Sequence, residues 1–280
     1  MCRLFGMVAG TRKDALDHLV GNKFSLLAQA DFDPARLQKD GWGIGSWQGR
    51  SWTVIKSTGA IYKEKPAFEK ASREAVSRIV LGHIRQASNP RGLPHDTLIS
   101  LDNCQPFYHG RYIFIHNGTV VIPDEVAATL GLYKKKLKGI NDSEVLFWLV
   151  MRNLRKLGSV PKAFARSVED IWNVWESCDE DTKKKAFKLF NQNAPYHSLN
   201  SFISDGKTLW AFCKHDAANT TKDFCGGGRP VFEVCYTTRG DATYVASERT
   251  DRSKDWEVMP DGTVLTVRAA QPKKCQLSDL

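Results

Sequence analysis

The 280-residue chain contains no long hydrophobic run. A membrane-spanning helix needs roughly 18–20 consecutive apolar residues, and no stretch approaches that length. The first residues also lack the basic flank and the apolar segment of a signal peptide, so we expect a cytoplasmic protein without a membrane partner. Hydrophobic residues make up 42% of the chain and charged residues 25%, which is typical of a soluble protein that buries a sizeable core.

Closely spaced cysteine pairs are missing as well. The seven cysteines are odd in number and scattered, and none forms a CxxC pair, so the sequence indicates neither a disulfide framework nor a zinc site. Glycines alternate with bulky residues over 41–45, but no Lys-Ser/Thr follows them and no helix pattern begins there. The pattern therefore does not fit a phosphate-binding loop, and we expect neither a metal nor another cofactor.

An excess of acidic residues is also lacking, because the formal net charge is +9. This positive charge is compatible with binding to nucleic acid or to an acidic partner. The lysine runs, however, are far apart in sequence and are not interleaved with aromatic residues, as a platform for single strands would be. Solvated helix and tail surfaces explain these runs more simply, and we regard nucleic acid as an unlikely partner. The runs are Lys134 to Lys136 with Lys138, Lys183 to Lys185, and Lys273-Lys274.

No internal repeat, low-complexity linker or break in composition divides the chain. We expect one domain over 1–270, beginning with Cys2 after processing, and a basic, frayed tail over 271–280. Apolar runs predict buried strands and spacings of three and four predict helices. The expected strands cover 4–9, 40–47, 52–56, 79–88 and 112–119. The expected helices cover 13–29, 66–78, 141–150 and 161–191, the last divided near 177–181. Hairpins are expected over 199–212, 231–247 and 256–267, and 220–230 is Gly-rich and expected to be mobile.

Cys2 would become the N-terminal residue if the initiator methionine were removed. The mature chain would then carry a thiol and a free α-amine on one residue, and this pair can serve as nucleophile and base. The apolar run that follows, Leu4 to Ala9, predicts a buried strand that would hold this terminus rigidly. A chance cysteine in front of an ordinary first strand is the alternative interpretation.

Three further positions could each have a chemical role or an ordinary structural role. Arg85 ends a strongly apolar strand, where a guanidinium needs a counter-charge from a structural carboxylate or from a substrate. Asn117 and Gly118 end another buried strand, and Asn-Gly is also the commonest tight-turn dipeptide. Asp142 opens a helix, where it suits the N-cap or the first turn.

The order of these blocks resembles the glutaminase domain of class II glutamine amidotransferases, which belong to the N-terminal-nucleophile (Ntn) hydrolases. The similarity is greatest to stand-alone members, is dense over 1–150 and weaker beyond, where Tyr244 to Glu248 resembles a late strand. It implies an α+β fold, with two mainly antiparallel sheets between helical layers in a four-layer αββα sandwich. The blocks are Cys2, the Gly-Trp-Gly at 41–43, His83-x-Arg85-x-x-Ser88, His116-Asn117-Gly118 and Asp142-Ser143-Glu144.

The resemblance gives the reacting groups their expected roles. Cys2 would form a γ-glutamyl thioester with its own α-amine as the base. Model α-amines titrate at roughly 7.7–8.0, which is close to working pH. The side-chain amide of Asn117 and the backbone N–H of Gly118 would form the oxyanion hole.

The resemblance also implies how the substrate is held. Arg85 would clamp the α-carboxylate with its planar fork, and Asp142 would pair with the α-ammonium group. Ser88 stands in place of the usual threonine and keeps the hydroxyl, so we expect its hydrogen bond to the substrate head to survive. Gly41 and Gly43 would let the backbone approach the nucleophile.

Two departures from the family limit what can be carried over. Gln86 stands where sugar-aminating members have a tryptophan that helps to gate ammonia transfer. Gln105 replaces the histidine that is usual in the HPF block, with an unknown consequence. The residues after Val150 read as the second half of the same fold, so ammonia would go to a separate acceptor enzyme or into solution.

These features leave three hypotheses for function. The first is hydrolysis of glutamine to glutamate and ammonia. The second keeps the chemistry but uses a γ-glutamyl peptide or a γ-glutamyl-thiol conjugate as the substrate. The proposed contacts of Arg85 and Asp142 reach only the glutamyl part, which all these substrates share. The third is a non-catalytic protein that binds nucleic acid or a partner through its basic surface.

Overall fold

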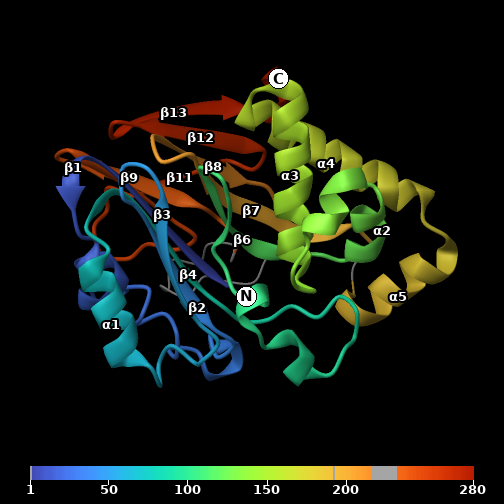
Figure 1. Ribbon diagram of the computed structural model, residues 1–280, viewed down its shortest axis with the longest axis horizontal. Coiled ribbons are helices and arrows are strands. Elements are labelled where there is room, and N and C mark those ends of the chain that lie inside the picture. Colours follow the sequence, from blue (N-terminus) through green and yellow to red (C-terminus); the bar gives the residue numbers. More distant parts are fainter. Residues whose placement is uncertain (1, 192, 216–231) are drawn as a thin grey trace.

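The computed structural model describes residues 2–191, 193–215 and 232–280 and contains two antiparallel sheets with helices outside them (Figure 1). The first sheet has the order β11-β9-β10-β1-β4-β2-β3 and the second the order β13-β12-β8-β7-β6-β5. The first comprises β1 (Arg3–Lys13), β2 (Trp42–Trp47), β3 (Trp52–Ser57), β4 (Ser77–Ile84), β9 (Cys235–Arg239), β10 (Ala242–Ala246) and β11 (Glu257–Val258). The second comprises β5 (Phe107–His109), β6 (Tyr112–Val120), β7 (Tyr196–Ser204), β8 (Thr208–Cys213), β12 (Thr263–Arg268) and β13 (Gln271–Gln276).

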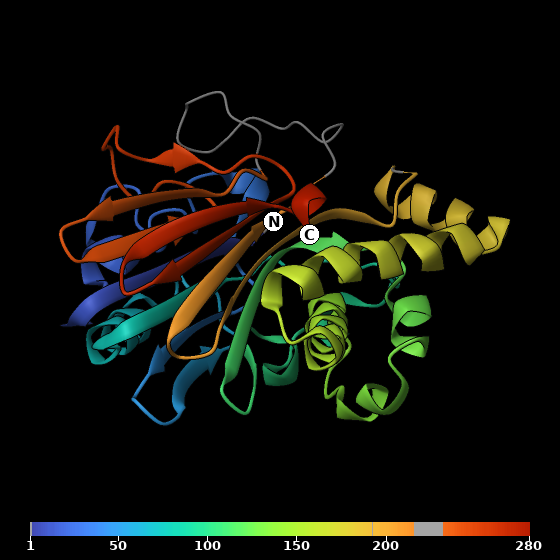
Figure 2. The same ribbon diagram turned by 90° about the horizontal axis from the view of Figure 1, so that it is seen from above.

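The helices cover the outer faces of the two sheets, as Figure 2 shows from above. Helix α1 packs on the first sheet through Phe68 and Ala71, and the other helices lie on the side of the second sheet. This order of layers confirms the expected α+β fold and the αββα sandwich. The helices are α1 (Lys65–Glu74), α2 (Pro123–Ala128), α3 (Asp142–Leu157), α4 (Val160–Ser177) and α5 (Glu180–Phe190).

Strand β1 is buried on both faces, which explains its unbroken apolar sequence. Phe5 and Met7 pack toward α1, whereas Leu4 and Val8 pack between the sheets. All four side chains are at most 2% exposed, and burial of each one contributes about 1.5–3 kcal/mol. The start of this strand, directly after Cys2, is therefore held firmly in the centre of the first sheet.

The helix expected over 13–29 is wrong. Strand β1 continues to Lys13, and only Asp17–Gly21 forms one short helical turn. Asn22 then leaves the helical region, with φ −70° and ψ 151°, while its N–H donates to the carbonyl of Asp17. Glycine and asparagine are weak helix formers, so Gly21-Asn22 ends the turn despite the apolar spacing around it.

Two expectations for the C-terminal part are also wrong. The segment 256–267 is not a hairpin, because β11 pairs with β9 in the first sheet and β12 pairs with β8 in the second. The segment 271–280 is not a frayed tail, because Gln271–Gln276 forms β13 along β12. Ala269 and Ala270 connect these strands with φ values of 48° and 60°, as in a type I′ turn. Alanine rarely adopts this conformation, which is why the sequence does not indicate the hairpin.

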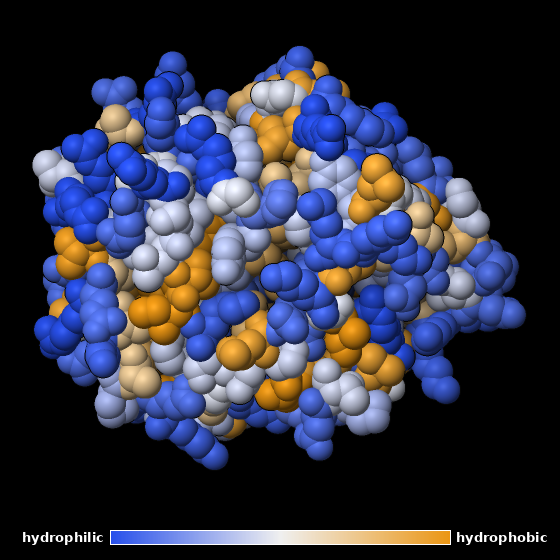
Figure 3. Space-filling model, viewed as in Figure 1, coloured by the Kyte–Doolittle hydropathy of each residue, from blue (hydrophilic) through white to orange (hydrophobic). Residues whose placement is uncertain are grey.

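The surface is mostly hydrophilic on the face shown in Figure 3, and its apolar side chains form small, separate groups. None of the helices in the described ranges is long and apolar enough to cross a membrane. The described residues also contain no group of three or more His, Cys, Asp or Glu side chains that could hold a metal ion. The Gly-rich segment over 220–230 lies outside the described residues.

Candidate active site

Cys2 is held by contacts from both ends of the chain. Leu4 donates its backbone N–H to the Ser247 hydroxyl (2.9 Å) and accepts from the Ser247 N–H (3.0 Å). Arg3 forms an ion pair with Glu248 (3.3 Å), and both side chains are almost completely buried. The same guanidinium donates from Nη1 to the carbonyl of Cys2 (3.2 Å). The segment that resembled a late family strand thus fixes the peptide next to the candidate nucleophile.

Cys2 as a whole residue is partly exposed, and its thiol donates to the carbonyl of Gln86 across 3.5 Å. Burial raises the pKa of this thiol, and Asp142 acts in the same direction, while Arg85 lowers it. The thiol is therefore protonated at neutral pH, and a base must remove its proton before the sulfur can attack. The thiol thus contacts the residue directly after Arg85, and Ser88, two residues further along, bonds Asp142.

Arg85 follows β4 and is only 3% exposed. Its N–H donates to the carbonyl of Gly41 (2.8 Å), and its Nη1 donates to the carbonyls of Asp40 (3.1 Å) and Leu98 (3.0 Å). Within the described parts of the chain, no carboxylate lies at ion-pair distance from its guanidinium. The cation is thus oriented by carbonyl groups and retains charge with which to bind an anionic ligand.

Asp142 is the first residue of α3 and is 1% exposed. It is a first-turn residue, because Asn141 is the N-cap and accepts from the N–H of Ser143 (2.9 Å). Its carboxylate accepts from the Ser88 hydroxyl (2.7 Å) and from the N–H of Val120 (2.9 Å). Two donors and the helix N-terminus thus stabilise a negative charge in a fixed position. The Ser88 hydroxyl thus orients this carboxylate, and its expected bond to the substrate head stays a prediction.

Asn117 and Gly118 lie within β6 and do not form a turn. The alternation along β6 directs Ile113, Ile115 and Asn117 toward the first sheet, where Ile113 and Ile115 pack with Leu4. Asn117 is 1% exposed, and neither atom of its side-chain amide has a hydrogen-bond partner among the described residues. Buried amides are normally paired, so this group is available for a ligand at the end of the inter-sheet core.

Gly118 permits a close approach of β7. A side chain there would place Cβ 1.8 Å from the carbonyl oxygen of Ser198. His116 fixes the other face of β6 against α3, with 2.8 Å from Nδ1 to the Ser143 hydroxyl and 3.1 Å from Nε2 to the Ser198 carbonyl. Because the carbonyl can only accept, Nε2 carries the proton and Nδ1 accepts. Burial lowers the pKa of His116, which keeps the ring neutral.

Gly41 and Gly43 accommodate another part of the chain. Gly41 has φ +124°, and a Cβ there would lie 2.6 Å from the sulfur of Cys104. A Cβ on Gly43 would lie 2.2 Å from the carbonyl oxygen of Gln105. These glycines therefore let the 104–106 segment approach β2. The sequence indicated a close approach at these glycines, and this segment is the part of the chain that makes it.

Three contributors to the site had no role assigned from the sequence, although Gln105 and Glu248 lay in segments that resemble the family. Asp40 accepts from the N–H of Ala87 (2.7 Å) and lies 3.0 Å from Nε2 of His95, so it orders the loop after Arg85. Gln105 contacts the backbone of His116, and Glu248 pairs with Arg3. Asp40 was indicated in the sequence only by its position before Gly41.

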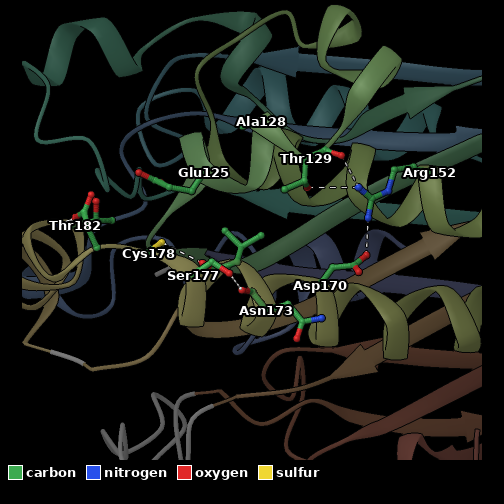
Figure 4. Close-up of a pocket in the computed structure, with 11 residues that line it drawn as sticks. Glu125, Ala128, Thr129, Arg152, Asp170, Asn173, Ser177, Cys178 and Thr182 are labelled. Atoms are coloured by element: carbon green, nitrogen blue, oxygen red, sulfur yellow. Dashed lines mark hydrogen bonds and ion pairs between the residues drawn. The ribbon is translucent and has the colours of Figure 1, made fainter.

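A hollow of about 630 Å³ lies elsewhere, among the helices α2, α3, α4 and α5. Figure 4 shows Arg152 on its wall, bonded to Thr129 and paired with Asp170, and Cys178 at a distance from them. None of the residues that carry the predicted chemistry lines it. We therefore assign the candidate active site to the region of Cys2, Arg85, Asn117 and Asp142.

Comparison with known proteins identifies relatives of both sequence and fold. The family described as "Glutamine amidotransferases class-II" matches residues 1–225. YafJ of Escherichia coli (strain K12) is 26% identical over 76% of this chain and 73% of its own length. A class-II domain protein from Silicibacter pomeroyi has a TM-score of 0.61 at 17% identity, over 98% of this chain and 99% of the other. Glutamine phosphoribosylpyrophosphate amidotransferase from B. subtilis has a TM-score of 0.60 at 16% identity, over 99% of this chain but 49% of that enzyme.

Proposed function

The chain belongs to the class II glutamine amidotransferases, and we propose on this basis that it hydrolyses the γ-amide of glutamine through a thioester on Cys2. The observation that carries the proposal is the buried amide of Asn117, which has no hydrogen-bond partner among the described residues and lies on the face of β6 that meets the start of β1. A buried donor without a partner is costly in a stable fold and valuable beside a developing oxyanion.

The chemistry requires removal of Met1, which leaves a free amine on Cys2. This amine takes the thiol proton, and the sulfur attacks the γ-carbonyl carbon of the substrate. The negative charge that develops on oxygen is stabilised by the side-chain N–H of Asn117 and the backbone N–H of Gly118. The proton passes from the amine to the departing nitrogen, ammonia leaves, and water hydrolyses the thioester to release glutamate and the thiol.

Substrate recognition would depend on the two fixed charges near the sulfur. Arg85 binds the α-carboxylate and Asp142 binds the α-ammonium, so the pair recognises a zwitterionic head and rejects simple amides. Ser88 contributes by holding Asp142 in place. The released ammonia would pass to a separate acceptor enzyme or into solution.

Glutamate release from glutamine, measured beside release from γ-glutamyl peptides and γ-glutamyl-thiol conjugates, tests this function. We expect glutamine to be the best substrate; preference for a conjugate would keep the mechanism and change the leaving group. Inactivity on all of them, together with salt-dependent nucleic-acid binding, would instead favour a non-catalytic basic protein.

Two measurements test the assignment of residues. Intact mass should show a chain without Met1 and, after treatment with a diazo-ketone analogue of glutamine, a single adduct on Cys2. Asn117→Ala should lower kcat by about 100- to 1000-fold. An unlabelled Cys2 in a correctly processed chain would overturn the mechanism.

A further inference from the structure

Gln105 makes a pair of hydrogen bonds with one residue of β6. Its side-chain Oε1 accepts from the backbone N–H of His116 (2.6 Å), and its Nε2 donates to the backbone carbonyl of His116 (3.2 Å). The side chain is 1% exposed. One donor and one acceptor facing a single peptide residue is the pattern by which antiparallel strands join hydrogen-bonded pairs.

The register of β5 explains this pattern. Phe107 lies opposite Phe114, and two steps further along the same ladder would place Gln105 opposite His116. The strand ends before that point, because the carbonyl of Gln105 turns toward β2 and occupies the space left by Gly43. The side-chain amide of Gln105 therefore makes the two bonds to His116 that the backbone of Gln105 would make if β5 continued to this residue.

The two bonds between the Gln105 side chain and His116 lie next to the candidate oxyanion hole. Asn117 follows His116, and its side chain has no hydrogen bond within the described residues that could hold it. Its direction therefore depends on the backbone of β6. On the β5 side, Gln105 is the group that bonds that backbone at His116, while Ser201 of β7 lies opposite His116 on the other side.

We propose that Gln105 is a positioning residue for the oxyanion hole. Its amide completes the edge of the second sheet and holds the 116–118 backbone so that Asn117 and the N–H of Gly118 face the reacting carbonyl. This inference rests on the function proposed above. It also gives a physical reason for the departure from the family pattern, because a neutral histidine, like glutamine, offers one donor and one acceptor.

The proposal is tested by Gln105→Met and Gln105→Glu, with Gln105→His as the rescuing variant. Methionine removes both bonds at similar volume, whereas glutamate keeps an acceptor for the N–H and loses the donor. We expect kcat to fall about 10- to 100-fold in the first two with KM changed less than about threefold, since the substrate-binding charges are untouched. The histidine variant should recover most of kcat. Alkylation of Cys2 by iodoacetamide should keep its wild-type rate in all three.

Gln29→Met is the matched control. Gln29 is also buried and donates to the backbone carbonyls of Phe24 (2.8 Å) and Arg249 (3.4 Å), but its neighbours Leu26 and Ala30 pack on the α1 side of the first sheet, away from β6. We expect this variant to lose stability and to keep its kcat. A double variant of Gln105→Met with Asn117→Ala should lose less than the product of the two single losses, because Gln105 acts in part through Asn117.

The outcomes separate this inference from the function on which it rests. A wild-type protein inactive on every γ-glutamyl compound overturns both. An active wild type in which Gln105→Met retains kcat, or in which the double variant shows fully additive losses, overturns the role of Gln105 alone. If Gln105→Met fails to fold, the kcat and KM of Gln105→Glu and Gln105→His decide the same question.

Discussion

Residues 1–150 and residues 151–280 contribute differently to the candidate active site. The first part supplies the thiol of Cys2, the guanidinium of Arg85, the amide of Asn117 and the carboxylate of Asp142. The second part supplies none of these groups, but Ser198, Ser247 and Glu248 bond the backbone or side chains beside them. The family match extends to residue 225, so it covers both the groups expected to react, which lie in the first part, and Ser198, which belongs to the groups that hold them.

The largest expected effect concerns the thiol in the first part. Cys2→Ala should lower glutamine hydrolysis by at least about 1000-fold, because no other group would form the thioester. The melting temperature should change little, since a partly exposed residue contributes little packing. Steady-state kinetics and calorimetry on the processed protein check both statements.

Cys178→Ala is the matched control for that experiment. Cys178 is also a partly exposed cysteine, but it lies in the hollow among α2, α3, α4 and α5. Its replacement should leave turnover unchanged. Retention of more than a tenth of the activity by Cys2→Ala would remove the reacting role from the first part of the chain.

A smaller effect is expected from the ion pair that joins the two parts. Glu248→Gln leaves the buried guanidinium of Arg3 without its counter-charge, which should cost about 3 kcal/mol of unfolding free energy. Turnover should also fall, because Arg3 bonds the carbonyl of Cys2. Urea unfolding and kinetics of the same preparation measure the two effects.

Glu257→Gln provides the comparison at the surface. Glu257 pairs with Lys274 across 3.3 Å, and both side chains are largely exposed, so the loss should stay below about 1 kcal/mol. If Glu248→Gln lost stability but kept full turnover, the second part of the chain would be structural only.

A further effect is a pH dependence centred on His18, which stays small near neutral pH. Its Nδ1 lies 2.6 Å from the Thr250 hydroxyl, and its ring packs between Phe5 and Tyr244, so it also joins the two parts. Burial lowers the pKa of His18 from 6.5 to about 4. Between these values the unfolded chain binds a proton that the folded chain does not, so acidification favours unfolding by at most about 1.4 kcal/mol per pH unit.

Unfolding free energies measured from pH 7 to pH 4 should therefore decrease, and His18→Gln should reduce the slope. His83, whose pKa burial lowers to about 3, maintains part of the slope in that variant. His109 is exposed on β5, and His109→Gln should alter the slope much less. An unchanged slope in His18→Gln would show that this contact does not titrate on unfolding.

Much of the fold could be predicted because the relevant signals are local. The apolar runs of β1 and β4, the hairpin of β2 and β3, and the break between α4 and α5 follow from patterns within a few residues. The failures depend on distant contacts or on unusual conformations. The β12–β13 turn uses alanines with positive φ, and the chain between β11 and β12 crosses from one sheet to the other.

The site followed the same rule. The residue types and their order in the first part pointed to Cys2, Arg85, Asn117 and Asp142. The supporting bonds could not be predicted, because each joins residues far apart in sequence, as Arg3 and Glu248 do. The role of Gln105 depends on the register of β5, which no pattern in the nearby sequence predicts.

The central position of β1 has a consequence for how the protein is made. Strand β1 is synthesised first, yet one of its partners, β10, begins only at Ala242. At roughly 5–20 residues per second, the ribosome needs roughly 10–50 s to reach that point. During this interval the first sheet cannot close over the N-terminus, which stays accessible to an aminopeptidase. On the proposed mechanism, Met1 would thus be removed during translation.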